Sequence, residues 1–214
     1  MEALRPVPAR IAAERRAVAR RSALAAALAT AAFTAACGSS GSTPPPAEAA
    51  PPSSHTTTGV FLPPEIATNA VTYEPALVPS NSTATVDVTV RGAQTEVSLN
   101  IDGLAPRRGY GVHATTAPCG TDPAAAGPRY QNRPDPDADA SHPSTDPEYA
   151  NSSNELWLDF TTTAQGTAYS SRVVGWTFRA GAARSLVILD HPTSTGSNDA
   201  GDAGARLACL DIDF

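Results

Sequence analysis

Imidazole and thiol groups carry most of the distinctive chemistry that this sequence offers, and both are scarce. The 214 residues include three cysteines and four histidines, His55, His113, His142 and His191. Imidazole nitrogens are common ligands of transition-metal ions, and a metal centre needs several such donors around one ion. Because the histidines are widely spaced along the chain, loops would have to bring them together around one metal ion.

The surroundings of the histidines favour simpler roles. His113 is expected at the end of a strand, packed or hydrogen-bonded, with metal ligation as the alternative. His142 and His191 lie in polar segments and are expected to be solvated, again with metal ligation as the alternative. The sequence contains no Gly-x-Ser-x-Gly elbow, no His-Glu-x-x-His motif and no phosphate-binding loop, so no hydrolase or nucleotide-binding signature stands out.

Two of the cysteines are candidates for a disulfide. Cys119 and Cys209 remain once Cys37 is assigned to an N-terminal processing motif, and they are 90 positions apart. In an exported chain such a pair predicts a structural disulfide, and two buried free thiols are the alternative. In the chain-entropy model, a disulfide that closes a loop of this length contributes about 4–5 kcal/mol.

The N-terminal segment has the pattern of a secretory signal. Arginines precede the uncharged apolar run Ser22–Ala36, which is too short to cross a membrane as a helix. Phe33–Gly38 resembles a bacterial lipobox with Thr34 in place of the usual leucine, and it would make Cys37 the diacylated residue. An ordinary signal peptide followed by an incidental cysteine is the alternative. We therefore expect residues 1–36 to be removed and the rest to be lipid-anchored on the outer face of the cytoplasmic membrane.

Charge and composition separate a linker from a domain. The formal net charge is −6, but six arginines and two glutamates give residues 1–36 a charge of +4, which leaves −10 for the remainder. Such an acidic remainder argues against a nucleic-acid partner. Residues 37–65 are rich in Pro, Ser and Ala and predict a disordered linker, so the folded domain is expected over residues 66–214.

Alternating apolar and polar residues over this domain predict strands and no long helix. The predicted strands are Ala70–Glu74, Thr85–Arg91, Thr95–Ile101, Leu156–Phe160, Ser171–Phe178, Arg184–Leu189 and Arg206–Ile212. Turns are expected at Gly92-Ala93 and near Gln165-Gly166, and long polar loops over 118–154 and 190–204. The pattern therefore predicts an all-β fold, a Greek-key β-sandwich or flattened barrel of about seven to eight antiparallel strands with two long loops.

Five segments of the domain form a recognisable set: Tyr110–His113, Cys119-Gly120, Ala126–Tyr130, Arg184–Val187 and Gly201–Cys209. Together they resemble the copper,zinc superoxide dismutase family, in particular its actinobacterial lipoprotein branch. The likeness spans roughly residues 68–214 and is most specific in Gly201–Cys209, which resembles the glycine-rich loop and disulfide strand that end these enzymes. The resemblance implies that Arg206 would guide an anionic substrate and that Cys209 closes a bridge.

The metal-ligand positions are where the sequence departs from the family. The family presents His-x-His to copper, and one register puts His113 and Thr115 there, whereas the alternative register puts Gly111 and His113 there. The bridging-ligand position holds Arg129, and the late copper-ligand position holds Leu189. One of four copper ligands therefore survives in either register.

The zinc positions and the charge of the site point the same way. His142 is one candidate zinc ligand, but Asn154–Trp157 replaces the usual His-x-x-Asp spacing. Arg129 places a permanent positive charge where a cation should sit. One interpretation is that Arg129 partly replaces the metal electrostatically by pairing with a carboxylate in the loop.

These substitutions predict an exported lipoprotein with a superoxide-dismutase-like domain that is catalytically inactive and acts as a binding or structural module without a cofactor. The alternative is an active superoxide dismutase, converting superoxide to oxygen and hydrogen peroxide with copper, and less so zinc, held by relocated His113, His142 and His191. The expected partner is the membrane, through the lipid on Cys37, and no nucleic acid. Superoxide is a partner only in the active alternative.

Overall fold

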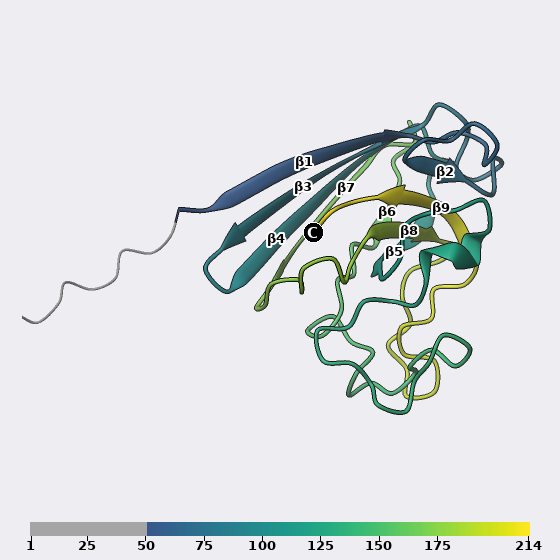
Figure 1. Ribbon diagram of the computed structural model, residues 1–214. Coiled ribbons are helices and arrows are strands. Elements are labelled where there is room, and N and C mark those ends of the chain that lie inside the picture. Colours follow the sequence, from purple (N-terminus) through teal and green to yellow (C-terminus); the bar gives the residue numbers. More distant parts are fainter. Residues whose placement is uncertain (1–50) are drawn as a thin grey trace, which may run out of the picture. The chain divides into compact units, whose positions relative to one another are not determined.

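Residues 51–214 are described by a computed structural model, and their strands form two sheets (Figure 1). The four-stranded sheet has the order β1-β3-β4-β7, the five-stranded sheet has the order β2-β9-β8-β5-β6, and the named strands pair antiparallel. The elements are β1 (Ser53–Val60), β2 (Ala70–Thr72), β3 (Thr83–Arg91), β4 (Gln94–Asp102), β5 (Gly109–Thr115), the 3₁₀ helix η1 (Pro123–Ala126), β6 (Phe160–Thr161), β7 (Ala168–Val174), β8 (Ser185–Leu189) and β9 (Arg206–Asp211).

The connections follow a Greek-key path. Strands β3 and β4 form a hairpin through Gly92, whose φ of +59° suits glycine. The chain then crosses to the other sheet for β5 and β6, returns to place β7 beside β4, and crosses again to place β8 beside β5. The predicted all-β Greek-key fold is thereby confirmed, although two of the nine strands in residues 51–214, β2 and β6, contain only three and two residues.

The two sheets differ in what covers their faces. The four-stranded sheet buries alternate residues of β3 and β4 and turns threonine, serine and charged residues to solvent. In the five-stranded sheet, β5, β8 and β9 are buried on both faces. One face of this sheet packs against the main core, and the other lies beneath the long loops. The core residues contributed by β3, β4, β5 and β8 are Ala84, Val86, Val88, Val97, Leu99, Ile101, Tyr110, Val112, Ala114, Leu186 and Ile188.

Strand β1 corrects the predicted linker over 37–65. Residues 53–60 are not disordered but pair with β3 along their whole length. The prediction relied on the lack of apolar side chains, but an edge strand is held by its backbone hydrogen bonds, and the β-branched run Thr56–Thr58 favours an extended chain. His55 lies in β1 and is exposed. Gly59 is buried, and a Cβ there would lie 2.4 Å from Leu210 Cδ1.

Strand β7 is the other edge of the four-stranded sheet, and it carries a charge on its core-facing side. In the pairing of β4 with β7, Arg172 stands opposite the buried Val97. The side chain of Arg172 nevertheless reaches solvent, because no further strand covers it. Two exposed apolar residues, Tyr169 and Val173, lie on the opposite, outer face of β7.

The predicted strand Leu156–Phe160 is wrong for most of its length. Its residues are buried except for the half-buried Asp159, but before the short β6 begins at Phe160 only Trp157 forms a bridge, with His113. The physical reason is a side chain that takes a backbone partner: the Val112 N–H donates to Asp159 Oδ1 at 3.1 Å, so a ladder bond with the backbone of this segment is lost. The predicted strand Ser171–Phe178 also ends early, because Trp176 leaves the sheet to pack against aromatic neighbours.

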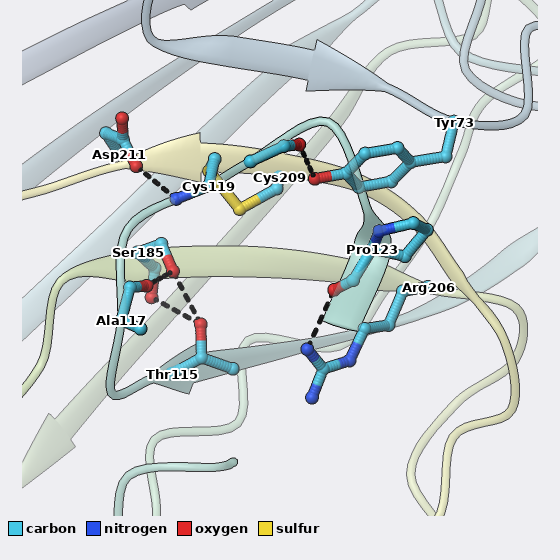
Figure 2. Close-up of a disulfide and its surroundings, with 10 residues drawn as sticks. Tyr73, Thr115, Ala117, Cys119, Pro123, Ser185, Arg206, Cys209 and Asp211 are labelled. Carbon is cyan, nitrogen blue, oxygen red and sulfur yellow. Dashed lines mark hydrogen bonds between the residues drawn. A yellow bond between two sulfur atoms is a disulfide. The ribbon is translucent and has the colours of Figure 1, made fainter. Parts of the chain in front are cut away.

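The disulfide between Cys119 and Cys209 confirms the pairing that the sequence predicts and fastens the first long loop to the five-stranded sheet (Figure 2). Three hydrogen bonds flank it in the same figure. The Cys119 N–H donates to Asp211 Oδ1 at 2.6 Å, and the Tyr73 hydroxyl donates to the Gly120 carbonyl at 2.8 Å. The Ser185 hydroxyl donates to the carbonyl of Ala117 at 2.6 Å. The start of the loop is therefore fixed at several adjacent points.

Removing the disulfide should lower stability by an amount that loop closure sets. We expect the double variant Cys119→Ser/Cys209→Ser to lose about 4–5 kcal/mol in free energy of unfolding, because the unfolded chain regains the entropy of a loop of 90 positions. Urea unfolding monitored by tryptophan fluorescence measures this loss. The single variant Cys37→Ser keeps the pair and serves as the control. A loss below about 1 kcal/mol in the double variant would show that the loop is held mainly by its hydrogen bonds.

Candidate functional site

The candidate site lies on the loop-covered face of the five-stranded sheet. The loops over 116–154 and 190–205 meet there, and a small apolar cluster forms beneath them, separate from the main core. Its buried members are Ala126, Val187, Leu189, Ala203 and Cys209. Because alternate residues of a strand share a face, β5 presents Gly111, His113 and Thr115 to this side. The sequence-predicted positions from β5 and β8 therefore do share one surface.

His113 is held by a two-step hydrogen-bond chain that the sequence did not reveal. Its ring is 2% exposed, and its Nε2 lies 2.8 Å from Thr193 Oγ1. Thr193 Oγ1 donates its own proton to Asp159 Oδ1 at 2.9 Å, and the Thr193 N–H donates to Asp159 Oδ2 at 2.7 Å. Since the threonine proton is already used, His113 Nε2 must be the donor in its bond to Thr193. The chain fixes the neutral tautomer that carries its proton on Nε2.

Burial and two arginines keep His113 neutral. Loss of water contact lowers the pKa of His113 well below its ordinary value, and the positive charges of Arg129 and Arg206 lower it further. The ring also lies 5.9 Å, centroid to centroid, from the ring of Trp157. The electrostatic potential at His113 is therefore positive, which disfavours both a proton and a metal cation.

Arg129 forms the buried ion pair of the site. Its Nε donates to Glu155 Oε2 at 2.9 Å, and its Nη2 donates to the carbonyl of Ser144. Backbone pairing holds Arg129 opposite Thr115, at the end of β5. The guanidinium also fills the space above Gly201, where a Cβ would lie 2.5 Å from Nη2. One side chain thus contacts both long loops.

Glu155 is the carboxylate that the sequence interpretation of Arg129 requires, and the pairing is thereby confirmed. Its side chain is 1% exposed and accepts further hydrogen bonds from Trp157 Nε1 and Gln131 Nε2, each at 2.8 Å. Burial raises the pKa of Glu155, and this outweighs the lowering effect of Arg129 and of the two hydrogen bonds. The carboxylate therefore depends on its partners to remain charged.

The positions that the family resemblance assigns to copper ligands do not offer a copper donor set in either register. The Thr115 hydroxyl lies 2.6 Å from the Ser185 hydroxyl and donates to it, because the Ser185 proton is used on the Ala117 carbonyl, and a neutral hydroxyl is a poor copper ligand. At Gly111, a Cβ would lie 2.7 Å from both Ala203 Cβ and the His191 carbonyl oxygen, so the second loop occupies the space that a ligand side chain would need. Leu189 pairs with Gly111 across β5 and β8 and packs in the apolar cluster.

The remaining histidines are not gathered around His113. His142 is exposed and lies 3.3 Å from Asp139 Oδ1 through its Nδ1. His191 is half-buried, with its Nε2 3.9 Å from Asp202 Oδ2. Within residues 51–214, no group of three or more His, Cys, Asp or Glu side chains is arranged to hold a metal ion. The alternative of relocated ligands therefore has no preformed site in this part of the chain.

Arg206 differs from Arg129 in having no carboxylate partner. Its Nη1 donates to the Pro123 carbonyl at 2.9 Å, a bond drawn in Figure 2, and its Nη2 donates to the Gly127 carbonyl at 2.6 Å. Among the salt bridges of residues 51–214, none includes Arg206. Burial lowers the pKa of Arg206, and the charge of Arg129 lowers it further, while Tyr73 opposes both effects.

Sequence reasoning missed Asp159, Thr193 and Glu155 as members of the site. Asp159 stands in an apolar segment where period-two alternation explains a polar residue without any function. Thr193 lies in a polar loop among other small polar residues and carries no distinguishing signal. Glu155 offered one usable signal, since it is a charged residue directly before the apolar run that starts at Leu156.

Comparison with known proteins gives one result on fold. No protein-family model matches the chain, and no curated protein matches it. Among solved structures, the chain is similar to the Cu/Zn superoxide dismutase from Brucella abortus, with 21% sequence identity and a TM-score of 0.48. The similarity covers 74% of this chain and 100% of that chain.

Breaking the buried ion pair should lower the free energy of unfolding by an amount that depends on pH. We expect Arg129→Met to lower the free energy of unfolding by about 3–5 kcal/mol at neutral pH, because it leaves the Glu155 carboxylate buried and unpaired. A carboxyl whose folded-state pKa is raised stabilises the fold below its unfolded pKa and loses that contribution as pH rises. The loss in Arg129→Met should therefore shrink in mildly acidic solution. Urea unfolding at several pH values measures it.

Two further variants separate charge burial from a general effect of losing an arginine. Arg133→Met removes a pair with Glu148 whose side chains are both more than half exposed, and it should cost less than about 1 kcal/mol. Arg129→Met/Glu155→Gln removes both buried charges and should be more stable than Arg129→Met alone. If Arg129→Met costs no more than Arg133→Met, the buried pair does not stabilise this site.

Proposed function

We propose that the chain is a superoxide-dismutase-like exported lipoprotein whose domain no longer catalyses dismutation and works as a binding module. The segments that resemble the family, the Greek-key arrangement of two sheets and the bridge between Cys119 and Cys209 support the first part. One observation carries the second: Arg129, at the position of the bridging metal ligand, is ion-paired with the buried Glu155.

The donor set explains why dismutation is not expected. Copper(II) requires three or four nitrogen donors, and redox cycling requires that these donors suit both oxidation states. At the resembling positions the chain offers the imidazole of His113, whose Nε2 already donates to Thr193. A cation placed there would also face the fixed charges of Arg129 and Arg206, which already lower the pKa of His113. The protein retains the framework of the site and uses its interior for other contacts.

Metal analysis tests the loss of the copper centre. The full chain, purified from an oxidising compartment, is soaked with copper and zinc, desalted and analysed by mass spectrometry. We expect far less than one metal ion per chain, because one buried imidazole beside two guanidinium groups is a poor ligand set. His113→Ala treated in the same way is the control and should retain the same residual metal.

The opposite outcome of the metal analysis would be equally clear. Near-stoichiometric copper that is lost in His113→Ala, together with dismutation of superoxide above that of free copper, would establish the active alternative. His142→Ala and His191→Ala would then show whether these loop histidines move to the metal. Copper that is retained in all three variants is adventitious and leaves no support for a relocated site.

We also propose that export and lipidation place this module at the outer face of the cytoplasmic membrane. The proposed anchor, Cys37, and the signal over residues 1–36 lie outside the residues that the structure describes. No helix within residues 51–214 has the length and apolar character that crossing a membrane requires. The support is the lipobox-like segment Phe33–Gly38, which follows a charged and then an apolar run.

Fractionation of a bacterium that processes lipoproteins tests the anchor. The unmodified chain should sediment with membranes, and Cys37→Ala should be released in soluble form, because the acidic remainder of the chain has no attraction for anionic lipid. Ser42→Ala provides the control, since it changes a small residue close to the lipobox and leaves Cys37 in place. Membrane association that survives Cys37→Ala would contradict lipid anchoring through this residue.

A further inference from the structure

A cleft of about 590 Å³ opens between the two long loops, above β5 and β8. Its floor includes His113 and Leu189, and Arg129 and Arg206 stand in its walls. The volume lies within the range of about 300–1,000 Å³ that small-molecule sites occupy. The cleft is therefore large enough for a small organic molecule and not only for an ion.

Arg206 is a half-buried cation of the cleft that forms no ion pair within residues 51–214. Glu155 neutralises Arg129, but Arg206 donates only to backbone carbonyls and has no carboxylate within ion-pair distance in residues 51–214. The charges of Arg129 and Arg206 both act on the buried His113, so the positive potential extends to the floor. A guanidinium that has lost part of its water without gaining a counter-charge is stabilised by an anion.

The acidic residues at the cleft do not supply that counter-charge. Asp122 is exposed and uses Oδ1 to cap the Ala124 N–H at 2.8 Å. Asp202 is exposed and uses Oδ1 to accept from the Gly204 N–H at 3.2 Å. Both carboxylates therefore stand at the solvent side of the cleft, engaged with backbone groups, and leave Arg206 without a partner.

The other walls of the cleft are mostly apolar. Prolines and alanines from both loops line it, and a leucine from β8 closes the floor. These apolar residues are Pro123, Ala124, Pro128, Ala140, Pro143, Leu189, Ala203 and Ala205. A small inorganic anion would leave these walls in contact with water, whereas an organic anion would cover them.

We propose that this cleft binds a small organic monocarboxylate, with the carboxylate at Arg206 and an apolar body against the prolines and alanines. The guanidinium of Arg206 keeps N–H groups that its two carbonyl partners do not use, and these match a carboxylate. Neutral His113 forms part of the floor without adding a charge that would need its own partner. This inference rests on the proposed function, because it gives the metal-free module a class of ligand.

Calorimetric titration of the full chain with benzoate tests the inference, with a chelator present so that bound metal cannot contribute. Benzoate should bind, while sulfate, which has charge without an apolar body, and benzyl alcohol, which has the body without charge, should bind about tenfold more weakly or not at all. Sulfate binding as tightly as benzoate would overturn the role of the apolar walls. No benzoate binding at millimolar concentrations would overturn the inference altogether.

Two kinds of cleft variant test the role of charge in benzoate binding, so that the test does not depend on the folding of one variant. Arg206→Gln should weaken benzoate about tenfold or more, whereas Arg172→Gln, at the exposed edge of β7, should leave it unchanged. Because Arg206 also fastens η1, a second variant leaves it in place: Ala205→Glu adds a negative charge at an exposed wall residue and should weaken benzoate to a similar degree. Ala205→Gln has the same size without the charge and should weaken it much less. Equal effects of the two Ala205 variants on benzoate binding would overturn the proposal that electrostatic attraction holds the carboxylate.

The metal analysis of the preceding section and this titration fail independently. Copper at the site would refute the metal-free module whatever benzoate does, since the titration is run with a chelator. A chain that contains no metal and does not bind benzoate would be consistent with the metal-free binding module but would refute the proposed ligand class.

Discussion

A guanidinium that leaves water must find a carboxylate or a set of carbonyl oxygens, and Arg129 finds both. Its partners come from three parts of the chain: Glu155 at the end of the first long loop, Ser144 within it, and Gly201 in the second loop. Loops of this length and composition have little apolar surface with which to hold themselves in place. The ion pair therefore does for the loops what a bound cation does in many proteins, and it defines the cleft by fixing the segments that line it.

The two arginines of the site divide stability and binding between them. Arg129 has a buried counter-charge, so its contribution is structural and its charge is largely cancelled. Arg206 is fastened by carbonyls alone, and its charge remains available. Burial acts against the charged forms of Arg206 and Glu155 alike, as their shifted pKa values show. Ionisable groups with shifted pKa values that line a cleft mark a candidate functional site.

What the sequence could predict follows from how local each signal is. The hairpin of β3 and β4 follows from strict alternation of apolar and polar residues around Gly92, and the domain contains two cysteines to pair, so both predictions are confirmed. Strand β1 was missed because its stability comes from the open edge of β3, which no pattern within residues 53–60 reveals. The chain from His113 through Thr193 to Asp159 joins residues from three distant segments, and only the folded sheet brings them together.

The two edges of the four-stranded sheet have a consequence for association with other chains. Unpaired strand edges are templates on which other chains can add, and β7 adds the exposed apolar residues Tyr169 and Val173. Arg172 lies on the opposite, core-facing side of β7, where a strand added to this edge would bury its side chain. Since a neighbouring strand would strip water from this guanidinium, the charge acts as a guard against edge-to-edge association and amyloid-like growth. The fold thus protects its own solubility at the strand that it leaves uncovered.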